Sequence, residues 1–206
     1  YSRRTEITRY LSDYSGTVKA RHLRNKWLDY LVKRKYWTTY IEFYNPTEAG
    51  TKQQCQFEFA RLNRLEDAAK EAAYTSALAL WNIGKSQPKE CDKLFSLLLS
   101  AKKISQPLAW QRFNKALLNH QYVLARYLQR YLKDDQYKAL AKRYYNVDRD
   151  PQLIKQFAEY NLHSDEELRI IEHGLVHLAK NNSHATLKAW SHYQQTHEFS
   201  HGARSK

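Results

Sequence analysis

Methionine is missing from this sequence, and glycine and proline are scarce, with five and four residues among 206. β-rich and doubly wound domains of this length usually need more glycine for tight turns and phosphate-binding loops. Strong helix formers such as Leu, Ala, Lys, Arg, Gln and Glu recur throughout instead. The composition therefore predicts an all-α protein.

Long apolar runs are also absent. No uninterrupted stretch approaches the roughly 20 residues that a membrane-spanning helix needs, so the chain is predicted to be soluble. No composition shift or long linker divides it, which predicts one helical domain over residues 1–206. Because no methionine stands at position 1, we expect a processed or excised piece of a longer chain, and its targeting stays open.

Acidic residues are outnumbered, 21 against 34 Lys and Arg, and the formal net charge is +13. Such an excess is consistent with a polyanion partner, either nucleic acid, anionic lipid or a carboxylate-bearing wall polymer, and equally with a generally basic proteome. Lys33-Arg34-Lys35 and Lys102-Lys103 are interpreted as solvated helix ends near negative dipole termini, or as part of a face that meets an acidic polymer. Most of the 16 Tyr and five Trp are expected to pack between helices.

Apolar residues recur at helical spacing from end to end. This periodicity predicts about eleven or twelve short helices in antiparallel hairpins, which stack as an irregular α-α superhelix, or solenoid. A single globular bundle is the competing fold, and no fixed-period repeat consensus is present. The main stripes are Leu23, Trp27 and Leu31; Ala69, Ala73, Ala77 and Leu80; Ala109, Phe113 and Leu117; Leu124, Leu128 and Tyr131; Leu168, Ile171, Leu175 and Leu178.

Short breaks with recognisable turn chemistry separate these stripes. Asn45-Pro46 indicates one turn, and Gly84 is expected in the left-handed conformation that ends a helix, with Pro88 in the first turn of the next. Asp150-Pro151 predicts an N-cap followed by proline, and Ser164 or Asp165 is expected to cap the helix after it.

Catalytic and metal-binding patterns are not found, so no catalytic, cofactor-binding or metal-ligating residue is predicted and no cofactor is expected. His173 and His177 have the i, i+4 spacing of zinc ligands, but the His-Glu-x-x-His pattern is absent and no other histidine adds a third ligand at a diagnostic spacing. We interpret the nine histidines as surface or packing residues. Asp134-Asp135 and Glu166-Glu167 are interpreted as solvated charges at helix starts.

Two cysteines, Cys55 and Cys91, are the whole complement. They are not in a Cys-x-x-Cys arrangement and cannot form a zinc site by themselves. Their spacing leaves two possibilities open, buried thiols or a disulfide that closes a 36-residue separation.

The segment from Leu80 to Phe95, which reads LWNIGKSQPKECDKLF, resembles a signature of the helical ring domain of soluble lytic transglycosylases. These enzymes cleave peptidoglycan glycan strands. Gly50-Thr51, Gln54-Cys55 and an aromatic helix through Phe57 and Phe59 resemble the partner cysteine segment of that family. The likeness covers about residues 20–100.

This resemblance implies a disulfide between Cys55 and Cys91 and a location in the periplasm of a Gram-negative bacterium. It also implies that catalysis belongs to a separate lysozyme-like domain. That domain's Glu-Ser, Gly-Leu-Met-Gln and Ala-Tyr-Asn-Ala-Gly motifs do not occur in this sequence. The chain is therefore expected not to be an enzyme as it stands, although its parent would be a lytic transglycosylase.

The leading functional hypothesis is a non-catalytic platform that positions peptidoglycan for a separate catalytic domain. A basic nucleic-acid-binding solenoid is the second, and the sequence disfavours it because no base-reading code recurs at fixed period. A scaffold for proteins of the cell-wall machinery is the third, and it shares the same fold.

Overall fold

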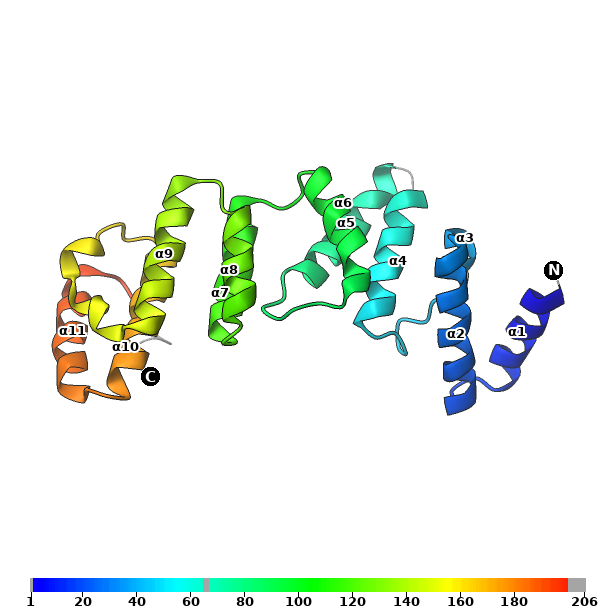
Figure 1. The fold of residues 1–206 in the computed structure, drawn as a ribbon, viewed down its shortest axis with the longest axis horizontal. Helices are drawn as coiled ribbons and strands as arrows, with labels where there is room; N and C mark the ends of the chain where they lie inside the picture. The colour runs from blue at the N-terminus through cyan, green and yellow to red at the C-terminus, as the bar shows by residue number, and fades with distance from the viewer. Residues whose placement is uncertain (1, 65–66, 200–206) are drawn as a thin grey trace. The chain divides into compact units, whose positions relative to one another are not determined.

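A computed structural model describes residues 2–64 and 67–199, and these residues contain eleven α-helices, four 3-10 turns and no strand. The predicted all-α fold class is confirmed (Figure 1). By their internal contacts the residues group into two compact units, Tyr1–Ser105 and Gln106–Lys206, called unit 1 and unit 2 below. The predicted single domain over residues 1–206 stays a prediction. No described helix is long and apolar enough to cross a membrane.

Unit 1 is a succession of helical hairpins. Helix α2 packs on α3, α3 on α4, and α4 on both α5 and α6. Its elements are α1 (Ser2–Asp13), α2 (Val18–Arg34), α3 (Trp37–Phe43), α4 (Thr51–Arg64), α5 (Asp67–Trp81), η1 (Lys89–Cys91) and α6 (Asp92–Ser100).

Aromatic side chains fill the spaces between α2, α3 and α4. Leu28, Leu31, Tyr40 and Ala60 are buried together, and half-buried rings pack around them. Tyr44 stacks on Phe57 with 3.8 Å between ring centroids. Large rings therefore compensate for helices too short to bury much aliphatic surface.

Unit 2 repeats the hairpin plan with a more irregular middle. Helix α7 packs on α8 and α9, α9 on α10, and α10 on α11. Its elements are α7 (Gln106–Leu118), α8 (Tyr122–Leu128), η2 (Gln129–Tyr131), α9 (Asp135–Arg149), η3 (Pro151–Lys155), η4 (Phe157–Glu159), α10 (Asp165–Ala179) and α11 (Ser183–Thr196).

Helix α10 approaches its neighbours closely at Gly174. A Cβ atom added there would lie 2.7 Å from Val147 Cγ1 and 3.0 Å from Ile154 Cδ1. The missing side chain thus allows α10 to pack against both α9 and η3. Tyr193 of α11 is fully buried beside them, and its hydroxyl donates to the Ile154 carbonyl at 2.6 Å.

Most of the predicted helix signals are confirmed. Ser164 accepts a hydrogen bond from the Glu167 amide at the start of α10. Asp150 caps a turn that begins at Pro151, although this turn is 3-10 rather than α. The three predicted stripes between Ala109 and Leu178 face inward, and so do Ala73 and Ala77 of the preceding stripe. The Ala69 side chain lies outside the described residues.

The prediction for Gly84 and Pro88 is wrong. Gly16 is the described glycine with a positive φ, and the other left-handed residues are Lys35, Lys102, His120 and His163. Pro88 precedes η1 as its N-cap instead of lying in its first turn. Helix α5 therefore ends at Trp81 without a left-handed residue, whereas the C-cap residue of α2, Lys35, is left-handed.

Candidate functional site

A basic groove of about 720 Å³ runs along α8, η2 and α9 in unit 2. Six of its eleven lining residues are cationic, and none of the eleven is acidic. One of the six is neutralised locally, since Lys138 pairs with Asp135 at 2.7 Å. The cations are Arg126, Arg130, Lys133, Lys138, Lys142 and Arg149.

Helical spacing places the cations of α9 on one face. Lys138, Lys142 and Arg149 follow one another at i, i+4 and i+11, so their side chains project from the same side of the helix. Asp134 fixes where that helix begins, because its side chain accepts from the Gln136 amide at 2.8 Å. Buried Leu132 and Ala141 form the apolar part of the lining.

One tyrosine, Tyr145, lines this groove, and Tyr127 and Tyr131 contact its Arg130. Arg130 lies over the rings of Tyr127, at 4.9 Å, and Tyr131, at 5.7 Å. Arg126 donates to the Tyr145 hydroxyl at 3.4 Å, and this hydrogen bond, with nearby positive charge, lowers the Tyr145 pKa. Arg126 thus favours negative charge on the Tyr145 oxygen.

The partly covered Tyr131 behaves differently. Burial, followed by its hydrogen bond with Tyr127, raises its pKa to about 12. The two hydroxyl oxygens lie 2.8 Å apart. Tyr131 therefore keeps its proton, and both rings lie within cation–π distance of the Arg130 guanidinium. The groove was not predicted from the sequence. The helical spacing of the basic residues that follow Asp134-Asp135 is the pattern that could have indicated it.

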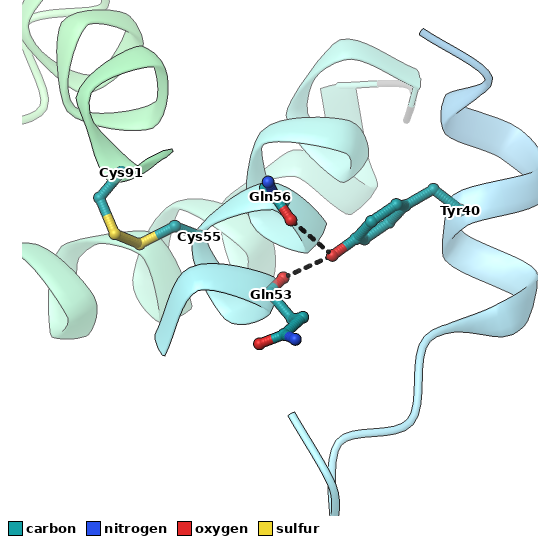
Figure 2. The surroundings of a disulfide bond; sticks show 5 residues. All are labelled: Tyr40, Gln53, Cys55, Gln56 and Cys91. Carbon is teal, nitrogen blue, oxygen red and sulfur yellow. Dashed lines mark hydrogen bonds between the residues drawn. A yellow bond between two sulfur atoms is a disulfide. The ribbon is translucent and has the colours of Figure 1, made fainter. Parts of the chain in front are cut away.

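The disulfide implied by the family resemblance is present in unit 1. Cys55 of α4 joins Cys91 at the end of η1, and both cysteines are fully buried (Figure 2). It ties α4 to the segment that leads into α6 across 36 residues of sequence.

Tyr40 of α3 anchors α4 from another side, as Figure 2 shows. Its hydroxyl lies 3.1 Å from the Gln53 carbonyl oxygen and 3.2 Å from Gln56 Oε1. Burial raises the Tyr40 pKa, so the hydroxyl keeps its proton and donates. Helix α4 is thus fixed to its neighbours by a covalent bond and by a buried hydrogen bond. These contacts indicate a structural role for Cys55, Cys91 and Tyr40.

The interpretation of the acidic pairs is wrong for one residue. Asp134, Asp135 and Glu166 lie at helix starts as predicted, but the Glu167 side chain is fully buried. Glu167 accepts from the amides of Leu162 and His163 at 2.7 and 3.0 Å. It also accepts from Arg143 Nη1 at 2.9 Å, so it holds the irregular loop before α10.

Glu58 is the described carboxyl group whose pKa burial raises most clearly, an effect that Arg61 opposes. Both Glu58 oxygens accept from Arg61 Nη1, at 3.2 and 3.0 Å. An acid that protonates a glycosidic oxygen needs a raised pKa and access to the substrate. Glu58 is largely buried and paired on its own helix, so this geometry indicates an intrahelical ion pair.

His173 and His177 lie side by side on α10, with 4.2 Å between ring centroids. The structure adds Asp148 of α9 to them, with Oδ1 2.8 Å from His173 Nε2. Asp148 stands 25 positions before His173, so the i, i+4 spacing of the two histidines does not point to it. Lys33, Arg34 and Lys35 are exposed at the end of α2, as predicted, whereas Lys103 pairs with Glu71 at 2.7 Å.

Comparison with known proteins extends these observations. The soluble lytic murein transglycosylase of Escherichia coli K12 is 29% identical over 154 residues, which are 74% of this chain and 23% of that protein. The Salmonella typhimurium protein of the same name is 33% identical over 105 residues, 50% of this chain and 16% of its own length. The chain is similar to soluble lytic murein transglycosylases. The predicted resemblance is thereby confirmed.

Solved structures of lytic transglycosylases have the same fold. An inactive mutant of the Pseudomonas aeruginosa lytic transglycosylase Slt matches 97% of this chain with a TM-score of 0.81 at 24% identity. The 70 kDa soluble lytic transglycosylase of E. coli matches 97% with a TM-score of 0.74 at 21% identity. This chain covers 32% of each of those chains. No protein-family model matches it.

Proposed function

We propose that this chain is a non-catalytic helical platform that binds peptidoglycan in the periplasm of a Gram-negative bacterium. In this role it positions murein for a catalytic domain elsewhere in a lytic transglycosylase. The basic groove on α8, η2 and α9 carries the proposal, and the similarity to murein transglycosylases supports the choice of ligand. The matched segment is 23% of the E. coli relative and 16% of the Salmonella typhimurium relative, so a separate catalytic domain is part of the proposal.

The groove has the chemistry that a carboxylate-bearing polymer requires. Peptidoglycan stem peptides carry carboxylates, which arginine binds through a planar pair of donors. Arg126 and Arg130 are exposed. Arg126 donates to the Tyr145 hydroxyl, and Arg130 lies over the Tyr127 ring. The Tyr127 ring is 48% exposed, so the part that Arg130 leaves uncovered offers apolar surface to sugar rings. Because the cations are close to solvent, binding is expected to weaken as salt increases.

Co-sedimentation with purified sacculi tests this proposal. The double variant Arg130→Glu and Lys142→Glu reverses two charges of the groove, and we expect it to lose most of the retention at low salt. The matched control is Lys33→Glu with Lys35→Glu, which makes the same charge change at the exposed end of α2 in unit 1. Circular dichroism and thermal unfolding check that all three proteins fold alike.

The comparison of the two double variants separates a groove from general basicity. Equal loss in both variants would show that the total charge of +13 determines retention. Retention that neither variant changes would reject the groove as the binding surface. Release of product from sacculi by this chain alone would reject the non-catalytic role.

Nucleic acid is the second candidate, and the tyrosines around Arg130 are the observation that favours it, since bases stack on aromatic faces. Adding RNA to the sacculus assay distinguishes the two ligands. Under the peptidoglycan proposal, RNA at equal mass leaves retention largely intact. Complete displacement, with tight and steeply salt-dependent RNA binding, would favour the nucleic-acid function.

A further inference from the structure

Three potential metal ligands meet where α9 packs on α10 in unit 2. Asp148 comes from the last turn of α9, and His173 and His177 come from one face of α10. One ligand atom from each lies within 4.8 Å of the other two. We propose that Asp148, His173 and His177 form a binding site for one divalent transition-metal ion of the zinc type.

The donor set suits zinc. Zn²⁺ binds imidazole nitrogen and carboxylate oxygen at about 2.0–2.2 Å, which places the ligand atoms of a tetrahedral site about 3.3 Å apart. Asp148 Oδ1 and His173 Nε2, at 2.8 Å, need to separate by about half an ångström for this geometry. His177 completes the set, because residues at i and i+4 project from the same helix face.

Packing holds two of the three ligands in place. The side chains of His173 and Asp148 are 6% and 2% exposed, and the Tyr144 ring packs edge-on against His173 at 4.9 Å. Gly174 lets α10 approach α9 next to Asp148. His177 is only partly buried and so gives the site its access to solvent. Preorganised ligands of this kind lower the cost of binding a metal ion.

Second-sphere groups also fit this assignment. Burial, followed by the charge of Asp148, raises the Tyr122 pKa, which places the Tyr122 hydroxyl near this carboxylate; the hydroxyl also lies 3.1 Å from His120 Nδ1. Burial lowers the pKa of both His173 and His177, which favours the neutral imidazole that a metal requires. Three protein ligands leave a fourth coordination position open.

The competing explanation is an ordinary buried hydrogen bond between Asp148 and His173. The role of His177 distinguishes the two explanations. The hydrogen bond does not need His177, whereas the metal site does. His177→Ala is therefore the decisive variant, and His184→Ala, at an exposed position on α11, is its matched control. Asp148→Asn tests the carboxylate with little change of shape.

Isothermal titration of tag-free chain with ZnCl₂, after EDTA treatment and dialysis, measures the site. We expect one zinc ion per chain, an increase in the thermal midpoint of unfolding, and binding weakened at least about tenfold by His177→Ala and Asp148→Asn. His184→Ala should bind like the parent. Cobalt(II) should give the intense visible absorption of a four-coordinate site in the parent and lose it in His177→Ala.

Thermal unfolding in EDTA shows whether each variant folds. Absence of saturable zinc binding by the folded parent would overturn the proposal. Binding that His177→Ala and His184→Ala weaken equally would also overturn it, because scattered surface histidines would then account for the uptake. Neither result would affect the proposed groove, because its assay reads sacculus retention and can be run in EDTA.

Discussion

Unit 1 and unit 2 are built from helices of similar length, yet different devices hold them together. In unit 1 the Cys55–Cys91 disulfide and aromatic packing around Tyr40 fix α4 to its neighbours. Unit 2 has no cysteine. It relies on the buried carboxylate of Glu167 and the close approach of helices at Gly174. Short hairpins with little shared core can thus be stabilised covalently or by one polar centre and tight backbone packing.

Removal of the disulfide should have the largest effect and should be confined to unit 1. Closing a loop of 36 residues stabilises by about 3–4 kcal/mol in the chain-entropy model. We expect Cys55→Ala with Cys91→Ala to lower the free energy of unfolding of unit 1 by about this amount. Urea unfolding followed by peptide-level hydrogen exchange measures each unit separately. Equal loss of protection in α3–α6 and α9–α11 would contradict independent stabilisation of the two units.

Glu167→Ala should cost nearly as much, but in unit 2. The change leaves Arg143 without its 2.9 Å partner and removes the acceptor for the amides of Leu162 and His163. Breaking a buried charged network typically costs about 3 kcal/mol or more. Hydrogen exchange should speed up first at residues 156–164 and in α10.

Glu159→Ala is the control for this network. Glu159 lies 3.8 Å from the same arginine but is 65% exposed, so we expect a change of less than about 0.5 kcal/mol. A loss in Glu159→Ala as large as that in Glu167→Ala would show that the number of acids near Arg143 matters, and burial does not.

Gly174→Ala should have an intermediate effect. Its Cβ would lie 2.7 Å from Val147 Cγ1, so α10 must move away or neighbouring side chains must shift. Overpacking costs about 1–3 kcal/mol, and better helix propensity returns up to about 1 kcal/mol. We expect a net loss in unit 2 by chemical denaturation. Gly50→Ala is the matched change in unit 1, because its Cβ meets only the flexible end of Gln53, and it should be close to neutral.

The sequence was sufficient for the helices and most of their ends. Periodic stripes such as Ala109, Phe113 and Leu117 indicate a buried helix face, and local capping at Ser164 determines where α10 begins. These signals are local in sequence, so no tertiary information is needed to read them. The disulfide depended on family resemblance, because spacing alone left Cys55 and Cys91 either paired or free.

Features that depend on contacts between helices were missed. Glu167 looks like a solvated helix-start acid, and only the fold shows that Arg143, 24 positions earlier, buries and neutralises it. Asp148 likewise comes within reach of His173 only because α9 packs on α10. The basic groove was missed because it forms only where the cationic face of α9 lies beside α8. Each of these pairings is set by tertiary packing, which helical periodicity does not encode.

The smallest expected effect is a pH dependence confined to unit 2. The His197 side chain is 1% exposed, and Nε2 lies 3.6 Å from Glu167 Oε2, beyond hydrogen-bond distance. Burial, followed by the charge of His163, lowers the His197 pKa below its ordinary 6.5, although Glu167 opposes the shift. The unfolded chain then binds more protons than the folded one, so stability is lost as the pH falls through about 6.5.

Chemical denaturation of the parent and His197→Gln between pH 7.5 and 5.5, in EDTA, measures this contribution. The parent should lose stability over that interval more steeply than His197→Gln, and hydrogen exchange should place the difference around α10 and α11. His173 and His177 titrate in both proteins, so their contribution cancels in the comparison. An identical pH slope in the two proteins, or a steeper slope in His197→Gln, would show that Glu167 compensates the burial of His197 fully. The polar centre of unit 2 would then be as insensitive to pH as the disulfide of unit 1.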